Sequence, residues 1–215
     1  MAEGPSSLIF EGCNFESSLT DRTGAGTITW AAATLLFRNC HVEGLFTVTG
    51  TSFTTLQAFE TEFKGGVTAT GTRPTTYQFF RCSFGAAAYD SLKPDVVETW
   101  FVLPSAAALT RGQLVELAGA TVANQGAVAV NAGVVLNAVA GAAVQTIVVT
   151  KGRIFVDVAA GVVAGDALKV DVAVPTQAIT AANAAALVLG QTIGAALEAT
   201  GATVAGEAYS EVNIR

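Results

Sequence analysis

The chain has 215 residues, of which 51% are hydrophobic and only 13% are charged, about half the charged share of an average globular protein. This composition excludes a disordered chain, which needs low hydrophobicity and high charge. The net charge is −6 and no basic cluster occurs, so we expect no nucleic-acid partner. Because the sequence has no uninterrupted apolar run of about 20 residues, we also expect no membrane span.

The N-terminal stretch MAEGPSSLIFEG lacks both a basic region and a long apolar core, so we expect no signal peptide. The chain has three cysteines, Cys13, Cys40 and Cys82. An odd number of cysteines without an export signal indicates reduced, buried thiols rather than a disulfide framework. Their wide spacing also lacks the close pairing of zinc ligands, and we expect neither a metal site nor a cofactor.

Four similar stretches dominate the first part of the chain: FEGCNFES, FRNCHVEG, AFETEFKG and FFRCSFGA. Aligned on their shared small residue, they recur at intervals of 27, 21 and 21 residues. Each copy has a bulky residue two positions later, and positions two apart in a strand share a face. We therefore expect an inward-facing ladder made of Cys13, Phe15, Cys40, Val42, Thr61, Phe63, Cys82 and Phe84.

A repeat of roughly 20 to 30 residues with one strand in the same phase per repeat is typical of a solenoid. We therefore interpret residues 1–95 as a short parallel β-helix, with one coil per copy. Cysteine suits such a stack because it behaves as a small buried hydrophobe. The alternative is an ordinary antiparallel sheet whose four strands happen to look alike.

The core material changes near the middle of the chain. Ten of the twelve phenylalanines lie at or before Phe84, and the only aromatic residues after Pro104 are Phe155 and Tyr209. The second half consists mostly of Ala, Val, Gly and Thr. This shift indicates two separately packed units, and we expect residues 96–108 to form a linker between them.

Residues 109–215 predict a small all-β domain, either a barrel or a sandwich. The pattern favours a hairpin that turns at Lys151 and Gly152, and a turn at Gly165 and Asp166 that begins a further strand. The alanine-rich segment 180–190 is ambiguous between a strand and a helical turn. The expected strands cover residues 113–117, 127–130, 134–139, 145–150, 153–158, 167–172, 187–191 and 208–214.

Few residues suggest catalysis. His41 is the only histidine, and its neighbours Cys40 and Glu43 raise the possibility of a Cys-His-acid arrangement. Cys40 and His41, however, are adjacent in an expected strand and point to opposite faces, so we expect His41 to face solvent. Glu60 and Glu62 are expected side by side on the outer face, whereas glycosidases need two carboxyl groups across a cleft. We therefore expect that the protein is not an enzyme.

One segment of the second half has a feature of lipoyl and biotin carrier domains, but we do not expect a carrier function. The segment AGVVAGDALKVD has the Gly-Asp turn of lipoyl and biotin carrier domains. In those domains the modified lysine lies in a tight exposed hairpin, whereas we expect Lys169 to lie within a strand.

The second half nevertheless resembles one family. The segments TRGQLVELAG, KGRIFVDVAAGVVAGDALKVD, LGQTIGAALEATG and EAYSEVNIR are similar to the small all-β cement, or decoration, proteins of tailed-phage capsids. The resemblance runs from about Leu109 to the end of the chain. In that family a Val-rich strand enters a Gly-Asp turn and resumes as a strand.

This resemblance implies a structural virion protein that is made in the host cytoplasm and then binds the outer surface of the capsid. Its implied partners are the major capsid protein and two further copies of itself, as a homotrimer. The repeats of the first half are a departure from the simplest family members. Two other functions stay open from the sequence: a receptor- or glycan-binding fibre or spike module, and a fragment of a polysaccharide lyase or hydrolase.

Overall fold

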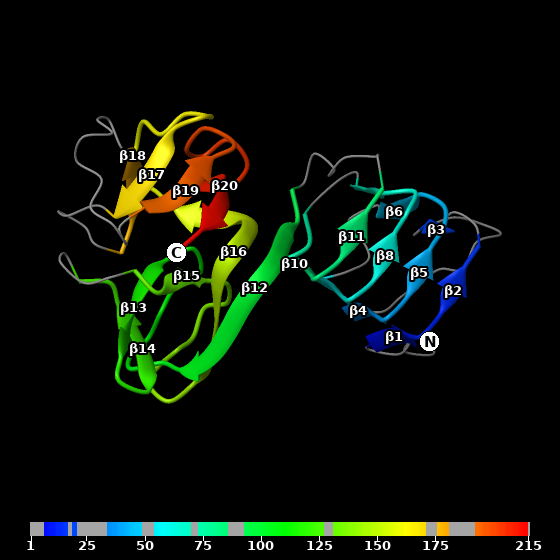
Figure 1. The fold of residues 1–215 in the computed structure, drawn as a ribbon, viewed down its shortest axis with the longest axis horizontal. Helices are drawn as coiled ribbons and strands as arrows, with labels where there is room; N and C mark the ends of the chain where they lie inside the picture. The colour runs from blue at the N-terminus through cyan, green and yellow to red at the C-terminus, as the bar shows by residue number, and fades with distance from the viewer. Residues whose placement is uncertain are drawn as a thin grey trace, which may run out of the picture. The chain divides into compact units, whose positions relative to one another are not determined.

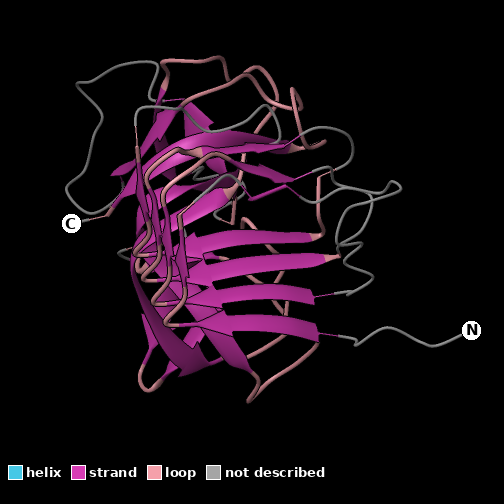
Figure 2. Ribbon diagram, turned by 90° about the vertical axis from the view of Figure 1, so that its right-hand side faces the viewer, coloured by secondary structure: helices cyan, strands magenta, loops and turns pink. Residues whose placement is uncertain are grey.

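The computed structural model describes residues 7–16, 19–20, 34–48, 54–69, 73–85, 93–126, 131–170, 176–180 and 192–214. These residues form an all-β protein with no helix (Figures 1 and 2), which confirms the expected all-β class. No helix long and apolar enough to cross a membrane occurs in these ranges. The chain divides into two compact units, Met1–Val96 and Val97–Arg215, and each is described by itself.

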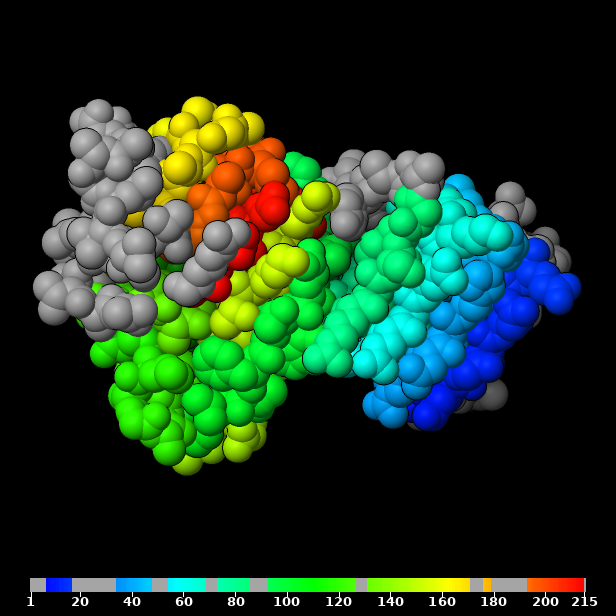
Figure 3. Space-filling model, viewed as in Figure 1, coloured from blue at the N-terminus to red at the C-terminus, as the bar shows by residue number. Residues whose placement is uncertain are grey.

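The first unit contains three sets of parallel strands. Each of the first three repeats contributes one strand to every set, and the fourth repeat contributes a strand to two of them. Neighbouring repeats pair in register, so that residues at the same point of the repeat lie directly beside each other. In Figure 3 the repeats appear as adjacent bands from blue to green. The three sets contain β1 (Ser7–Glu11), β4 (Thr34–Arg38), β7 (Thr55–Phe59) and β10 (Thr76–Phe80); β2 (Asn14–Phe15), β5 (His41–Val42), β8 (Glu62–Phe63) and β11 (Ser83–Phe84); and β3 (Leu19–Thr20), β6 (Phe46–Val48) and β9 (Val67–Ala69).

Each repeat turns its first corner at a residue in the left-handed region of φ. The φ angle is 63° at Gly12 and 49° at Asn39, Glu60 and Arg81. Glycine and asparagine adopt this conformation readily, whereas glutamate and arginine do so seldom. The corners align because the N–H of each corner residue donates to the strand-end carbonyl of the next repeat, at 2.9 to 3.0 Å in the three pairs observed.

Aromatic rings fill the interior of the first unit. Phe37 is fully buried, and its ring centroid lies 5.3 Å from those of Phe10 and Phe46 and 5.8 Å from that of Phe63. Contacts of this length between offset or edge-on rings add to the free energy gained by burial. The aromatic content of the first half of the sequence is therefore the core of this unit.

The second unit is built from antiparallel strands in the order β12-β16-β20-β19-β17-β18, while β15, β13 and β14 branch from β16. A mainly aliphatic cluster packs within it: Leu109, Val115, Val122, Val135, Val139 and Val148. Segment 96–108, expected as a linker, lies largely within β12. The strands are β12 (Asp95–Pro104), β13 (Leu114–Ala118), β14 (Thr121–Asn124), β15 (Gly133–Val135), β16 (Gln145–Asp157), β17 (Ala167–Val170), β18 (Ala178–Thr180), β19 (Thr192–Ala196) and β20 (Glu207–Asn213).

Over the described residues these strands do not form a closed barrel. β14 pairs only with β13, and β18 pairs only with β17, so both end their paths through the sheet. Single parallel bridges, Ser105 with Val122 and Val158 with Ala178, stand where a barrel would need continuous ladders. The structure therefore supports a mixed β unit but not the barrel.

The expected hairpin at Lys151 and Gly152 is wrong. β16 runs through both residues without turning, and Gly152 pairs with Val212 of β20. Glycine accepts an extended conformation as easily as a turn, so its presence did not decide between them. The turn at Gly165 and Asp166 is confirmed, because the N–H of Val163 donates to Asp166 Oδ2 at 2.9 Å and β17 begins directly afterwards.

The other strand predictions have mixed outcomes. Those over 113–117, 167–172 and 208–214 correspond to β13, β17 and β20, and Lys169 lies within β17 as expected. The strand predicted over 134–139 is observed only as Gly133–Val135. The strands predicted over 127–130 and 187–191 lie outside the described residues. So does the possible helical turn in 180–190, apart from Thr180, which is the last residue of β18. The sequence patterns missed β14, β18 and β19.

Candidate functional site

The sheet formed by β2, β5, β8 and β11 presents a polar row to solvent. Asn14, His41, Glu62 and Ser83 pair in register along this row, one from each repeat. The intervening positions, Phe15, Val42, Phe63 and Phe84, lie on the other face of the sheet and pack with the core. The alternation of a two-residue period thus separates the polar face from the interior.

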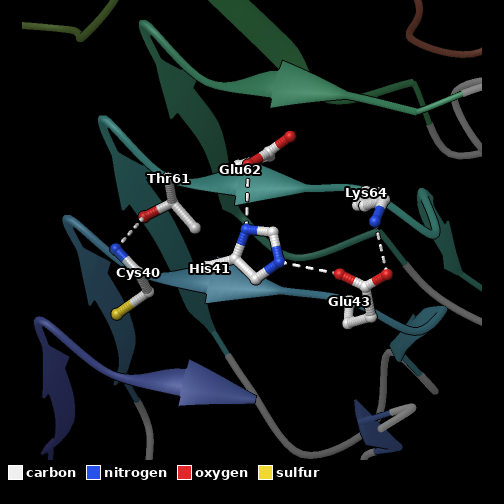
Figure 4. A network of polar contacts seen from close by, with 6 residues as sticks. All are labelled: Cys40, His41, Glu43, Thr61, Glu62 and Lys64. Atoms are coloured by element: carbon white, nitrogen blue, oxygen red, sulfur yellow. Dashed lines mark hydrogen bonds and ion pairs between the residues drawn. The ribbon is translucent and has the colours of Figure 1, made fainter. Parts of the chain in front are cut away.

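His41 is the centre of a charged network on this face (Figure 4). Its Nδ1 lies 2.8 Å from Glu62 Oε2, and its Nε2 lies 2.9 Å from Glu43 Oε2. The other oxygen of Glu43 accepts a hydrogen bond from Lys64 Nζ at 2.5 Å. The network therefore joins two consecutive repeats through side chains 21 residues apart.

The charges in this network stabilise one another. The hydrogen bonds to Glu43 and Glu62 raise the pKa of His41 above 6.5, since an imidazolium donates from both ring nitrogens. Lys64, and then His41, lower the pKa of Glu43, while Glu43 raises the pKa of Lys64. When His41 is protonated, two cations and two carboxylates therefore lie side by side on an exposed surface.

The Cys-His-acid arrangement considered from the sequence does not form. Cys40 Sγ turns away from His41 and contacts the carbonyl oxygens of Arg38 at 3.2 Å and Phe10 at 3.5 Å. His41 faces solvent, as expected, and Figure 4 shows the sulfur of Cys40 directed away from the imidazole ring. The thiol and the imidazole therefore cannot exchange a proton.

The two carboxylates of the third repeat have separate partners. Glu60 lies at a corner, where Arg81 Nη1 is 3.4 Å from its Oε1, whereas Glu62 binds His41. Both glutamates are exposed, and neither faces the other across a cleft. This arrangement does not supply the opposed acid and base that glycoside cleavage needs.

The small residues of the ladder lie just after the corners. Each side chain bonds the carbonyl oxygen two residues earlier, at 3.6 Å for Cys13, 3.2 Å for Cys40, 3.0 Å for Thr61 and 3.5 Å for Cys82. The bulky members pair directly, Phe15 with Val42, Val42 with Phe63 and Phe63 with Phe84. The structure therefore brings the eight ladder residues into two adjacent columns.

The cysteines have the surroundings of structural thiols. All three are free: Cys40 is buried and the other two are half-buried. Burial raises the pKa of Cys82 to about 12, so the reactive thiolate is scarce at neutral pH. Over the ranges described above, no group of three or more His, Cys, Asp and Glu side chains is arranged to hold a metal ion.

A second polar cluster, in the second unit, was missed by the sequence patterns. Asp157 of β16 and Glu207 of β20 pair directly opposite each other. Arg111 Nη1 lies 3.4 Å from Glu207 Oε2, and its guanidinium carbon lies 5.1 Å from the ring centroid of Phe155. Gln177 Nε2 donates to Asp157 Oδ1 at 3.0 Å. Only the register of two strands 50 residues apart reveals this cluster.

This cluster has a structural role. Directly opposed like charges destabilise a sheet, and Arg111 offsets that repulsion by binding one of the two carboxylates. Burial raises the pKa of Asp157, while the bond from Gln177 opposes the increase. The Asp157 N–H also donates to the carbonyl oxygen of Gly112 at 2.9 Å. The arrangement thus fastens the turn at residues 111–112 to the central ladder.

No protein-family model matches the chain, and searches of curated proteins and of solved structures found no match. Function is therefore inferred from the chain itself.

Proposed function

We propose that this chain is a structural virion protein that binds the outer surface of a tailed-phage capsid and stabilises the shell. Its second unit is the attachment module and contacts the major capsid protein as a homotrimer. Its first unit is a short parallel β-helix displayed by that module. The in-register pairing of three parallel sheets supports the β-helix interpretation.

The observation that carries this proposal is the position of exposed apolar side chains. Leu117, Val163 and Leu197 are 56%, 53% and 41% exposed. Each lies in one of the segments by which the second half resembles capsid cement proteins. Single exposed apolar residues are common, but protein contact surfaces are built from such residues, and a cement protein requires a contact surface. We assign the three side chains to the contact with the capsid.

The polar surface of the first unit also favours binding over catalysis. Its charged groups engage one another, as His41 does with Glu43 and Glu62 and as Arg81 does with Glu60. The Cys40 thiol contacts backbone carbonyl oxygens instead of His41, so this imidazole does not have that nucleophile to activate. A low overall charge further suits a protein that spends its working life against neighbouring subunits.

A binding assay with capsids that lack the protein tests this proposal. Leu117→Asp, Val163→Asp and Leu197→Asp are expected to lower capsid occupancy without changing the melting temperature, because all three side chains are exposed. Leu45→Asp is the matched control, since Leu45 is an exposed leucine of the first unit and is 37% exposed. Unchanged occupancy for all three variants would contradict the assigned contact.

Electron microscopy of the parent particle separates this proposal from the fibre or spike alternative. Density that decorates the shell regularly is expected. Density confined to the tail tip would instead indicate a receptor- or glycan-binding module. Light scattering on the purified full chain checks whether it forms the trimer that we assign to the second unit.

A further inference from the structure

The first repeat lies at one end of the stack of repeats. β1, β2 and β3 stand at the ends of their three sheets, and no described strand pairs with their outer edges. Such an edge presents a row of backbone N–H and C=O groups that can pair with another chain. All three edges belong to one repeat, residues 7–20, so they lie at the same end of the stack.

The interior of this repeat is also less covered than that of its neighbour. Leu8, Phe10, Cys13 and Phe15 are half-buried and pack against the core from outside it. The residues that pair with them in register are buried, at 1% exposure for Leu35, 0% for Phe37, 4% for Cys40 and 0% for Val42. The apolar columns of the stack therefore continue up to this end.

Over its five residues, β1 lacks three of the features by which proteins prevent strand addition at an edge. Natural edges are commonly protected by lysine, by proline or by a β-bulge. β1 has the sequence SLIFE and pairs with β4 through five consecutive residues without a bulge. Its only charge is Glu11, at the end of the strand. Its central residue, Ile9, is 54% exposed.

We propose that this end of the first unit binds the same end of a second copy of the chain, through a two-fold axis that crosses β1 at Ile9. The two β1 strands then pair antiparallel, with Ile9 opposite Ile9. Leu8 faces Phe10 of the second copy, so the inward columns continue across the contact. Ser7 faces Glu11, so no like charges meet.

The other two edges satisfy the same symmetry. A two-fold axis perpendicular to the stack exchanges the remaining two sheets, so β2 of one copy meets β3 of the other. The two strands run antiparallel there, and each is two residues long. A single strand from an unrelated partner would match only one edge, whereas a second copy matches all three. The geometry therefore favours self-association over capture of another chain.

This contact has a consequence for stoichiometry. A two-fold contact is isologous and closes after two subunits, so every particle contains an even number of chains. The inference does not depend on capsid binding. If the second units also form trimers, the combined symmetry is that of a dimer of trimers with six chains.

Replacing Ile9 with charged residues tests the proposal, with mass measured by light scattering and sedimentation. Ile9→Lys places two lysines against each other at the axis, so the mass of the particle is expected to fall to half. Ile9→Glu is expected to do the same. A mixture of the two variants restores the original mass, because opposite charges then face each other. Leu45→Lys is the matched control, since Leu45 is exposed in the same unit but outside β1.

Two results would overturn the proposal. The first is an odd number of chains in the wild-type particle, including a monomer at the highest attainable concentration. The second is a mass that Ile9→Lys leaves unchanged while far-ultraviolet circular dichroism confirms that the variant is folded. Capsid binding is measured in parallel, and we expect Ile9→Lys to retain it. If Ile9→Lys loses capsid binding at an unchanged mass, the edge binds the capsid and not a second copy.

Discussion

The two units of this protein build their cores in opposite ways. In the first unit, parallel strands place residues of successive repeats directly beside one another, so that one column carries Phe46 next to Val67 and another carries Phe59 next to Phe80. In the second, antiparallel strands bring unlike segments together, as β16 pairs with β20 from the C-terminus. A position in the first unit is therefore constrained by its neighbours 21 or 27 residues away. A position in the second unit is constrained by a partner whose sequence is unrelated to it.

The aromatic contacts follow this difference. The rings of Phe59 and Phe80 stack at 4.6 Å with an interplanar angle of 2°, as in-register repetition dictates. In the second unit, Phe155 meets Tyr209 at a tilted 5.2 Å across one pair of strands. The first unit thus depends on a cluster of aromatic rings that spans its repeats, whereas the second depends on aliphatic packing and on close approach of its backbones.

The largest expected effect comes from removing the central ring of the aromatic cluster in the first unit. Phe37→Ala removes a ring that is fully buried and that contacts rings of three repeats, including Phe10 and Phe63. The lost burial and the cavity should lower the free energy of unfolding of the first unit by about 3–5 kcal/mol. Differential scanning calorimetry should show the transition of the first unit shifted strongly downward.

The same experiment tests whether the two cores are separate. We expect the transition of the second unit to stay in place in Phe37→Ala. The reciprocal variant is Ile154→Val, at a position in the second unit that is 1% exposed. It should lower the free energy of unfolding of the second unit by about 0.5–1.5 kcal/mol and leave the transition of the first unit in place. A single transition that moves as a whole in both variants would show that the cores are coupled.

The second unit should be most sensitive where its backbones approach each other. Gly194 of β19 has a φ of 156°, and a Cβ there would lie 1.7 Å from the carbonyl oxygen of Glu211 on β20. Because backbone cannot move aside as a side chain can, Gly194→Ala should cost about 1–3 kcal/mol or more. Chemical denaturation followed by circular dichroism measures this loss.

Gly141→Ala is the matched control for this variant. A Cβ at Gly141 meets nothing within 4 Å, so the change should stay within about 0.5 kcal/mol. Equal effects at Gly141 and Gly194 would mean that the general cost of replacing glycine, and not the close approach of β19 to β20, sets the stability.

Strand positions could be predicted from the sequence more accurately in the first unit than in the second. The interval of a repeat gives the register in which its strands pair, so the spacing of Phe63 and Phe84 predicts that they lie in adjacent strands. The corner conformations at Glu60 and Arg81 were not readable, because neither residue type favours positive φ. They follow from alignment with the corners at Gly12 and Asn39, and thus from tertiary context.

In the second unit, the sequence does not indicate which strands pair, because antiparallel partners need not resemble each other. Lys151 and Gly152 looked like a hairpin because local turn chemistry was the only available signal, whereas pairing with β20 keeps them extended. The ion pair between Arg111 and Glu207 joins residues 96 positions apart, and no periodic pattern in the sequence predicts it. On the polar face of the first unit, the exposure of His41 followed from strand alternation. Its two carboxylate partners required the register of β5 with β8.

The smallest expected effect concerns that histidine and needs a spectroscopic measurement. Its hydrogen bonds to Glu43, and secondly to Glu62, raise its pKa above 6.5 in the folded protein. A raised pKa means that the folded state binds the proton more tightly than the unfolded state does. The resulting stabilisation is fully present below pH 6.5 and is lost as the pH rises through the folded pKa.

Because His41 is the only histidine, proton NMR should show a single imidazole titration with a midpoint above 6.5. Glu43→Gln should lower this midpoint most, Glu62→Gln should lower it less, and added salt should lower it further, since the network is exposed. Glu98→Gln is the control, because Glu98 pairs with Lys151 in the second unit and should leave the titration unchanged. A midpoint at or below 6.5 in the wild-type chain would show that His41 does not join the repeats through its two carboxylate partners. On this surface the repeats would then be joined by the Lys64–Glu43 and Arg81–Glu60 ion pairs, in addition to the backbone and the interior.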